Sequence, residues 1–118
     1  MREIKFRGKR VDTGEWVFGD LMQARTRDGV SCYICECYLN GVTIKVIPES
    51  VGQFCGLHDK NGVEIYTGDI MEWGGIRLLV DWDPIHARIN IGKDLLTKGY
   101  AITAEVIGSI HTNPELLK

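Results

Sequence analysis

The sequence contains no stretch of apolar residues long enough to cross a lipid bilayer. Residues 1–7 alternate charged and apolar side chains, so they lack the apolar segment of a secretory signal peptide. We therefore expect a cytoplasmic protein that does not associate with membranes.

The sequence also lacks a strong net charge and the common nucleotide-binding and metalloprotease motifs. Its 14 basic and 16 acidic residues leave a net charge of −2, so no global field draws the chain toward nucleic acid. No Walker A, GxGxxG or HExxH pattern occurs. We predict no enzymatic activity and no cofactor, and any nucleic-acid binding must depend on a local basic patch.

Long helical periodicity is missing, whereas short alternating segments are frequent. The composition, 44% hydrophobic and 25% charged, is that of a folded globular chain. Turn residues separate the segments at 12–14, 40–41, 59–62 and 74–75. We predict strands over 4–7, 15–22, 30–39, 42–46, 54–57, 64–66, 70–73, 76–82, 85–91 and 101–110, with single helical turns over 93–98 and 113–118.

These expectations describe an all-β, mainly β chain with a small barrel-like fold and one or two short helical turns. The domain prediction is a single domain over 1–118, with two closely packed β subdomains, 1–50 and 51–118, as the alternative. Residues 14–22 and 62–71 share the order turn glycine, aromatic strand, Gly-Asp and aliphatic pair. This likeness is either an internal repeat or chance similarity between two hairpins.

Basic residues gather at the N-terminus. They are Arg2, Lys5, Arg7, Lys9 and Arg10, opposed there only by Glu3. On a strand, Lys5, Arg7 and Lys9 project from one face, and either Phe6 or Trp16 faces the other way or stacks nearby. Small β folds bind single strands through basic grooves with aromatic platforms. We therefore list Lys5, Arg7, Lys9 and Arg10 as candidate nucleic-acid contacts, and an ordinary solvated strand face as the alternative.

The cysteines raise the question of a zinc site. Cys32-x-x-Cys35 and Cys55-x-x-His58 supply four ligands in two close pairs, as in a Cys₃His site. Strand alternation, however, places Cys32 and Cys35 on opposite faces and Cys35 with Cys37 on one face. We expect structural thiols and no metal, and we keep a zinc-stabilised domain as an alternative. The histidines are His58, His86 and His111. No nucleophile motif surrounds any cysteine, so we do not expect Cys-His nucleophilic catalysis.

Asp81 and Asp83 flank Trp82 and share one strand face. Paired carboxylates can bind Mg²⁺ or exchange protons. A solvent-facing strand edge with Trp82 buried beneath it explains the same pattern, and we favour that interpretation.

Three blocks of this sequence resemble the YopX family of phage and prophage proteins. They are 2–7 (REIKFR), 53–70 (QFCGLHDKNGVEIYTGDI) and 105–117 (EVIGSIHTNPELL). The resemblance implies a β fold whose C-terminal half is an SH3-type barrel, a phage or prophage origin, and cytoplasmic expression in a bacterium. It supplies no established activity and no catalytic residues. Cys55 and His58 depart from the usual pattern, in which a hydroxyl residue and a basic residue stand there.

The functional hypothesis is a phage accessory protein that works by binding or assembly and not by catalysis. Its partner is expected to be a second copy of the chain or another protein, because exposed strand edges tend to pair. Trp16, Trp73 and Trp82 serve either as interface anchors or as core. A nucleic-acid-binding module and a zinc-stabilised domain are the alternatives.

Overall fold

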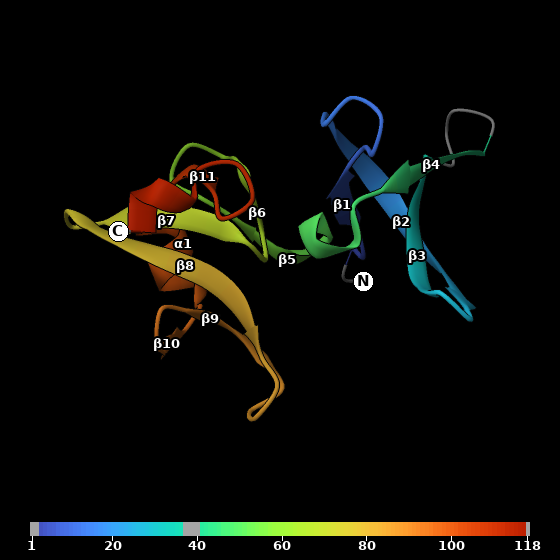
Figure 1. Cartoon of the computed structure of the whole chain (residues 1–118). Coiled ribbons are helices and arrows are strands. Elements are labelled where there is room, and N and C mark those ends of the chain that lie inside the picture. Colours follow the sequence, from blue (N-terminus) through green and yellow to red (C-terminus); the bar gives the residue numbers. More distant parts are fainter. Residues whose placement is uncertain (1–2, 37–40, 118) are drawn as a thin grey trace. The chain divides into compact units, whose positions relative to one another are not determined.

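The computed structural model describes residues 3–36 and 41–117, and it divides the chain into two compact units, 1–54 and 55–118 (Figure 1). Each unit is mainly β, which confirms the predicted fold class. The predicted strand residues 37–39, together with Cys37 and Asn40, lie outside the described residues, as does Arg2. No helix in the described part of the chain is long and apolar enough to span a membrane.

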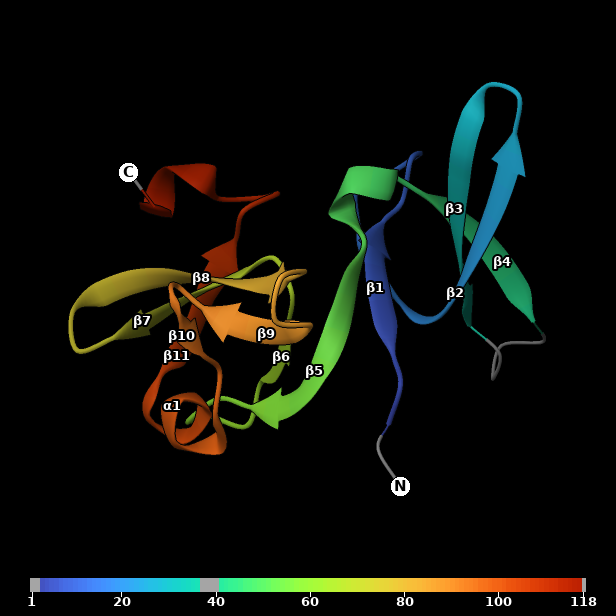
Figure 2. The same cartoon turned by 90° about the horizontal axis from the view of Figure 1, so that it is seen from below.

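The first unit is an antiparallel sheet built on a long β2–β3 hairpin. Its elements are β1 (Phe6–Lys9), β2 (Trp16–Thr26), β3 (Gly29–Glu36), β4 (Val42–Val46), the 3₁₀ turn η1 (Pro48–Ser50) and the first residues of β5 (Gly52–His58). Within this unit the strand order is β4-β3-β2-β1-β5, so β1 lies between β2 and β5 (Figure 2).

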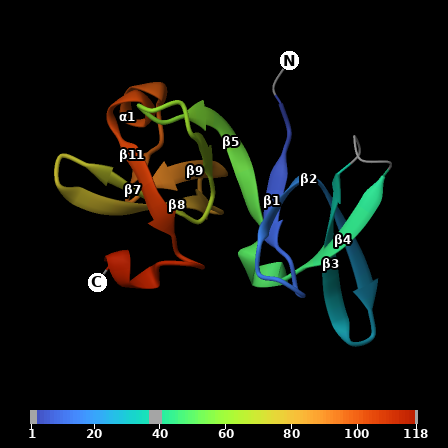
Figure 3. The same cartoon turned by 90° about the horizontal axis from the view of Figure 1, so that it is seen from above.

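The second unit holds the rest of the elements. They are β6 (Glu64–Tyr66), β7 (Asp69–Trp73), β8 (Ile76–Asp83), β9 (Arg88–Ile91), β10 (Asp94–Leu95), α1 (Lys98–Thr103), β11 (Glu105–Ser109) and the 3₁₀ turn η2 (Pro114–Leu117). Five strands form a sheet in the order β10-β9-β8-β7-β11, and α1 leads directly into β11 (Figure 3).

Each unit has its own hydrophobic cluster. Strand alternation supplies the first, from Val17, Cys32, Ile34 and Val46, with Phe6 packed against them. The second gathers seven residues of the second unit: Ile65, Met71, Val80, Ile91, Leu96, Ala101 and Ala104. Cys55 and Leu57 pack against this second cluster, so alternate residues of β5 are used as core.

The barrel-like expectation needs correction, because within the described residues neither sheet closes. In the first unit the segments after β1 and β4 meet at a bridge between Arg10 and Val46. The Val11 amide donates a hydrogen bond of 3.2 Å to the Lys45 carbonyl, and the Ile47 amide donates one of 2.8 Å to the Lys9 carbonyl. The SH3-type likeness of the C-terminal half stays a prediction.

The strand expected over 101–110 begins only at Glu105, so the prediction was wrong for residues 101–104. Residues 98–103 form α1, because the Thr97 side chain accepts a hydrogen bond of 3.3 Å from the Tyr100 amide and caps the helix. Residues 94–95 within the expected helical turn are strand β10. Residues 84–87 form a turn, so the strand expected over 85–91 begins only at Arg88.

The two copies of the repeat-like motif differ in structure. Strand β2 passes straight through Gly19, where a Cβ would lie 2.2 Å from the Cys35 carbonyl oxygen. The second copy instead breaks at residues 67–68, where buried Asp69 accepts a hydrogen bond of 2.8 Å from the Tyr66 amide. The first glycine permits close backbone approach, whereas the second serves a turn.

Candidate functional site

The two faces of β1 carry different kinds of side chain. Phe6 packs against the first hydrophobic cluster, and Gly8 lies so close to Val46 that an added Cβ would stand 2.9 Å from the valine Cβ. Because side chains alternate along a strand, Lys5, Arg7 and Lys9 project from the other face. This confirms the expected sharing of one face by the three cations.

Aromatic rings from the two neighbouring strands meet these cations. The register places Arg7 opposite Phe18 and Lys9 opposite Trp16, while the Phe54 amide donates a hydrogen bond of 2.8 Å to the Lys5 carbonyl. We call the set Lys5, Arg7, Lys9, Trp16, Phe18 and Phe54 the basic–aromatic face.

Cation–ring contacts join side chains of the basic–aromatic face. The Arg7 guanidinium carbon lies 4.3 Å from the centre of the Trp16 ring, and Lys9 Nζ lies 5.4 Å from the same centre. Lys5 Nζ lies 5.4 Å from the centre of the Phe54 ring. Such contacts stabilise the cation over the ring and hold the side chains in place.

Solvent reaches the members of this face unequally. Arg7 is 8% exposed and Phe54 is 3% exposed, so both are buried. Phe18 is 37% exposed, and Lys5 and Lys9 are half-buried. Solvent therefore reaches Lys5, Lys9 and Phe18, whereas the guanidinium of Arg7 is buried.

Arg10, the fourth candidate contact, lies off the face. Its Nε and Nη2 donate hydrogen bonds of 2.8 and 2.9 Å to the two carboxylate oxygens of Asp12. The hydrogen bond from Arg10 lowers the pKa of Asp12 to about 2. Arg10 is thus engaged with a local carboxylate that stays ionised at neutral pH.

Within each unit, the two side chains of the proposed zinc-ligand pair do not converge. Cys32 is buried in the first cluster, whereas Cys35 pairs across the sheet with Asp20 and Thr43 on the opposite face. In β5, Cys55 packs on the second cluster while His58 is exposed. No group of three or more metal-binding side chains occurs among residues 3–36 and 41–117.

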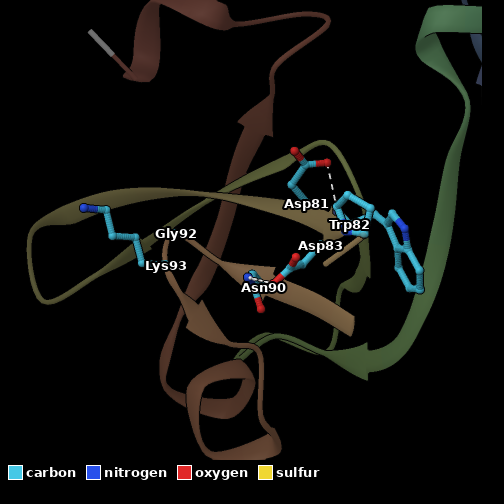
Figure 4. A pocket seen from close by; sticks show the side chains of 7 residues that line it. Asp81, Trp82, Asp83, Asn90, Gly92 and Lys93 are labelled. Carbon is cyan, nitrogen blue, oxygen red and sulfur yellow. Dashed lines mark hydrogen bonds between the residues drawn. The ribbon is translucent and has the colours of Figure 1, made fainter. Parts of the chain in front are cut away.

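The paired carboxylates Asp81 and Asp83 lie beside an open pocket of about 380 Å³ (Figure 4). Asn90 is the cross-strand partner of Asp81, and Arg88 that of Asp83, so all four share one face of β8 and β9. Trp82 is 51% exposed and its ring points away from Asn90 (Figure 4), which corrects the expectation that it is buried.

Asp83 organises the turn that follows it. Its carboxylate accepts hydrogen bonds from the Ile85 amide at 2.9 Å and the His86 amide at 3.3 Å. It also lies 2.8 Å from His86 Nδ1 and 3.0 Å from Asn90 Nδ2. The His86 side chain is the main reason that the pKa of Asp83 falls to about 2. The main role of the Asp83 carboxylate is therefore to stabilise the turn at residues 84–87.

A further carboxylate, missed in the sequence, is the buried Asp59. It accepts hydrogen bonds from the amides of Asn61, Val63 and Val106, at 2.8, 2.9 and 2.9 Å. Burial alone raises the pKa of Asp59, but these three bonds outweigh it and the pKa is lowered. The only local signal was the Asp-x-Asn-Gly turn pattern at 59–62.

Large apolar side chains are exposed near the β7–β8 turn of the second unit. Trp73 is 39% exposed and its cross-strand partner Ile76 is 54% exposed. The Trp73 ring centre lies 5.1 Å from that of Tyr100, and its Nε1 donates a hydrogen bond of 3.1 Å to Thr103. Ile102, on the same helix as Tyr100, is 56% exposed.

Two comparisons with known proteins found similarity along nearly the whole chain. The family model described as YopX protein matches residues 5–118. The crystal structure of protein EF1440 from Enterococcus faecalis is similar, with a TM-score of 0.61 and 22% sequence identity over 100% of both chains. At that identity the likeness concerns the fold alone. No curated protein matches.

Proposed function

The chain belongs to the YopX family, and from this premise we propose that it is a phage or prophage accessory protein that works in the bacterial cytoplasm by binding and not by catalysis. The support comes from two carboxylates that have structural roles. Asp59 and Asp83 both have lowered pKa values because amide or histidine groups stabilise their ionised forms. A general acid needs the opposite shift.

We infer that the partner is a nucleic acid and that the basic–aromatic face receives it. The observation that carries this proposal is the alignment of Lys5, Arg7 and Lys9 on one face among aromatic rings. Cationic side chains gain affinity by displacing counterions from phosphates, and exposed rings gain it by stacking on bases.

Neighbouring acids limit the strength of this binding. Glu3 Oε2 lies 4.0 Å from Lys5 Nζ. Asp20 lies two residues after Phe18, on the same face of β2. The net charge of −2 provides no long-range attraction for nucleic acid. We therefore expect modest affinity that is clearest at low salt.

Fluorescence anisotropy of a labelled oligonucleotide tests the proposal. With phosphate contacts at Lys5 and Lys9, the slope of log K against log salt should be roughly −1.4, since each contact on a single strand contributes about −0.7. The K5Q/K9Q variant should lose most of that slope and bind about tenfold more weakly at low salt. K93Q/K98Q removes the same charge from two exposed lysines of the second unit and should bind normally. No binding by the unaltered protein at low salt would refute the proposal.

Self-association is a second candidate, favoured by the exposed Trp73, Ile76 and Ile102. Tryptophan is a frequent anchor of protein interfaces, and exposed aliphatic side chains add apolar surface that a partner can cover. Sedimentation velocity over micromolar concentrations should then give a dimer or higher oligomer, which the I76D/I102D variant reduces to a monomer. A monomer at all concentrations would remove this candidate.

A further inference from the structure

We propose that the basic–aromatic face binds unpaired nucleotides by stacking a base on Phe18 while Lys5 and Lys9 hold phosphates on either side. This rests on the proposed function and names the ligand class more narrowly. The shared chemistry is an exposed base joined to a phosphate backbone, which both single-stranded DNA and single-stranded RNA provide.

Differences in burial among the rings of Phe54, Trp16 and Phe18 identify Phe18 as the stacking surface. Phe54 is 3% exposed, so a base cannot reach its ring. Trp16 already has the Arg7 guanidinium 4.3 Å and Lys9 Nζ 5.4 Å from its ring centre. Phe18 is 37% exposed, a larger fraction than that of Trp16 or Phe54, so it is the ring of this face that solvent reaches most readily.

The sheet register sets the spacing of the three contact points. Lys5 and Lys9 are four residues apart on an extended segment, or about 13 Å. Phe18 lies opposite Arg7, midway between them, and one strand spacing of about 4.8 Å to the side. A polynucleotide running along β1 therefore meets a cation, then a ring beside its path, then a second cation.

Arg7 is a positioning residue in this arrangement. At 8% exposure it cannot touch a phosphate directly. Its guanidinium instead stacks on Trp16 and places a permanent positive charge beneath the phosphate path. Because its replacement would disturb packing, the experiment leaves Arg7 unchanged.

The experiment compares four labelled ligands of equal length at low salt by fluorescence anisotropy. They are oligo-dT, oligo-rU, a DNA backbone without bases, and a DNA duplex. Stacking predicts that dT or rU binds tighter than the abasic strand and the duplex, because a duplex keeps its bases stacked internally. Base stacking is worth about 1–3 kcal/mol, so F18A should weaken dT or rU binding by about 5- to 150-fold and leave abasic binding nearly unchanged.

Two further variants separate stacking from folding. F18L keeps an apolar side chain without a π face and should behave like F18A, whereas F18W should bind at least as well as the unaltered protein. Circular dichroism confirms that each variant is folded. Equal binding of dT, rU and the abasic strand, or an F18L variant with full affinity, would overturn the stacking proposal while leaving phosphate binding intact. Absence of binding to all four ligands would overturn both proposals.

Discussion

The carboxylate of Asp59 ties the β5–β6 turn to the start of β11. It accepts three backbone hydrogen bonds, one of them from Val106, which is 47 positions away. Beside it, the Lys60 amide donates a bond of 3.0 Å to the Ala104 carbonyl, and Lys60 Nζ lies 3.8 Å from the Glu105 carboxylate. Replacing Asp59 with alanine should therefore loosen both segments of the second unit together.

The magnitude follows from the three lost acceptor contacts. A hydrogen bond to a charged group contributes about 1.5–3 kcal/mol. The turn residues Asn61 and Val63 are exposed, so their amides can bind water in the variant, whereas Val106 is half-buried. We therefore expect D59A to lower the free energy of unfolding by about 2–4 kcal/mol, less than the full sum. D59N keeps one carbonyl oxygen as an acceptor, but its NH₂ group faces the amide of Val106 or those of the turn, which are also donors. This substitution should lower the free energy of unfolding by about 1–3 kcal/mol.

Urea unfolding in a W16F background measures this loss, because the two remaining tryptophans, Trp73 and Trp82, both lie in the second unit. D28A is the control, since Asp28 is an exposed turn residue of the first unit. A D59A variant within about 0.5 kcal/mol of the parent protein at pH 7 would refute the reasoning, because that is the range of ordinary surface substitutions.

The same carboxylate predicts a pH dependence of defined sign. The pKa of Asp59 is lower in the folded protein than its usual value of about 3.9. Its stabilisation is therefore fully present above pH 3.9 and is lost as the pH falls through the folded pKa. The parent protein and D59N should therefore differ less in free energy of unfolding below about pH 4 than at neutral pH. A difference that grows on acidification would contradict the lowered pKa of Asp59.

Three other substitutions test separate parts of the structure. G19A should lower the free energy of unfolding by about 2–4 kcal/mol, because its Cβ would lie 2.2 Å from the Cys35 carbonyl oxygen, and normal stability in urea would contradict that contact. D83A should speed amide hydrogen exchange in the 84–87 turn without affecting the β7–β8 amides, since the turn amides lose their acceptor. T103V should speed exchange of the Trp73 indole proton, whose acceptor lies 3.1 Å away, and cost about 0.5–1 kcal/mol, and an unchanged exchange rate would show that the bond is absent in solution.

Local chemistry made many elements predictable from sequence. The Gly74-Gly75 turn was found because both residues adopt positive φ, 57° and 83°, which glycine permits. The shared face of Lys5, Arg7 and Lys9 was likewise predictable, since alternation along a strand is a local property. Helix α1 was missed because its six residues have too little periodicity to compete with a strand pattern.

The rest depends on contacts between distant segments. Phe54 meets Lys5 only because β5 pairs with β1, and no local pattern in either segment encodes that pairing. The burial of Arg7 has the same origin, since a basic residue on an alternating strand is ordinarily solvated. For this reason the sequence identified the cations but not Phe18 as the accessible ring.

Mapping of backbone amide shifts by NMR during titration with oligo-dT tests binding through the basic–aromatic face most directly. The shifts should concentrate on residues 5–9 and 16–18, and they should fade as salt is raised. Amides of β7 and β8 should stay in place and serve as the internal reference. An unchanged spectrum at low salt, or shifts confined to the second unit, would contradict the account.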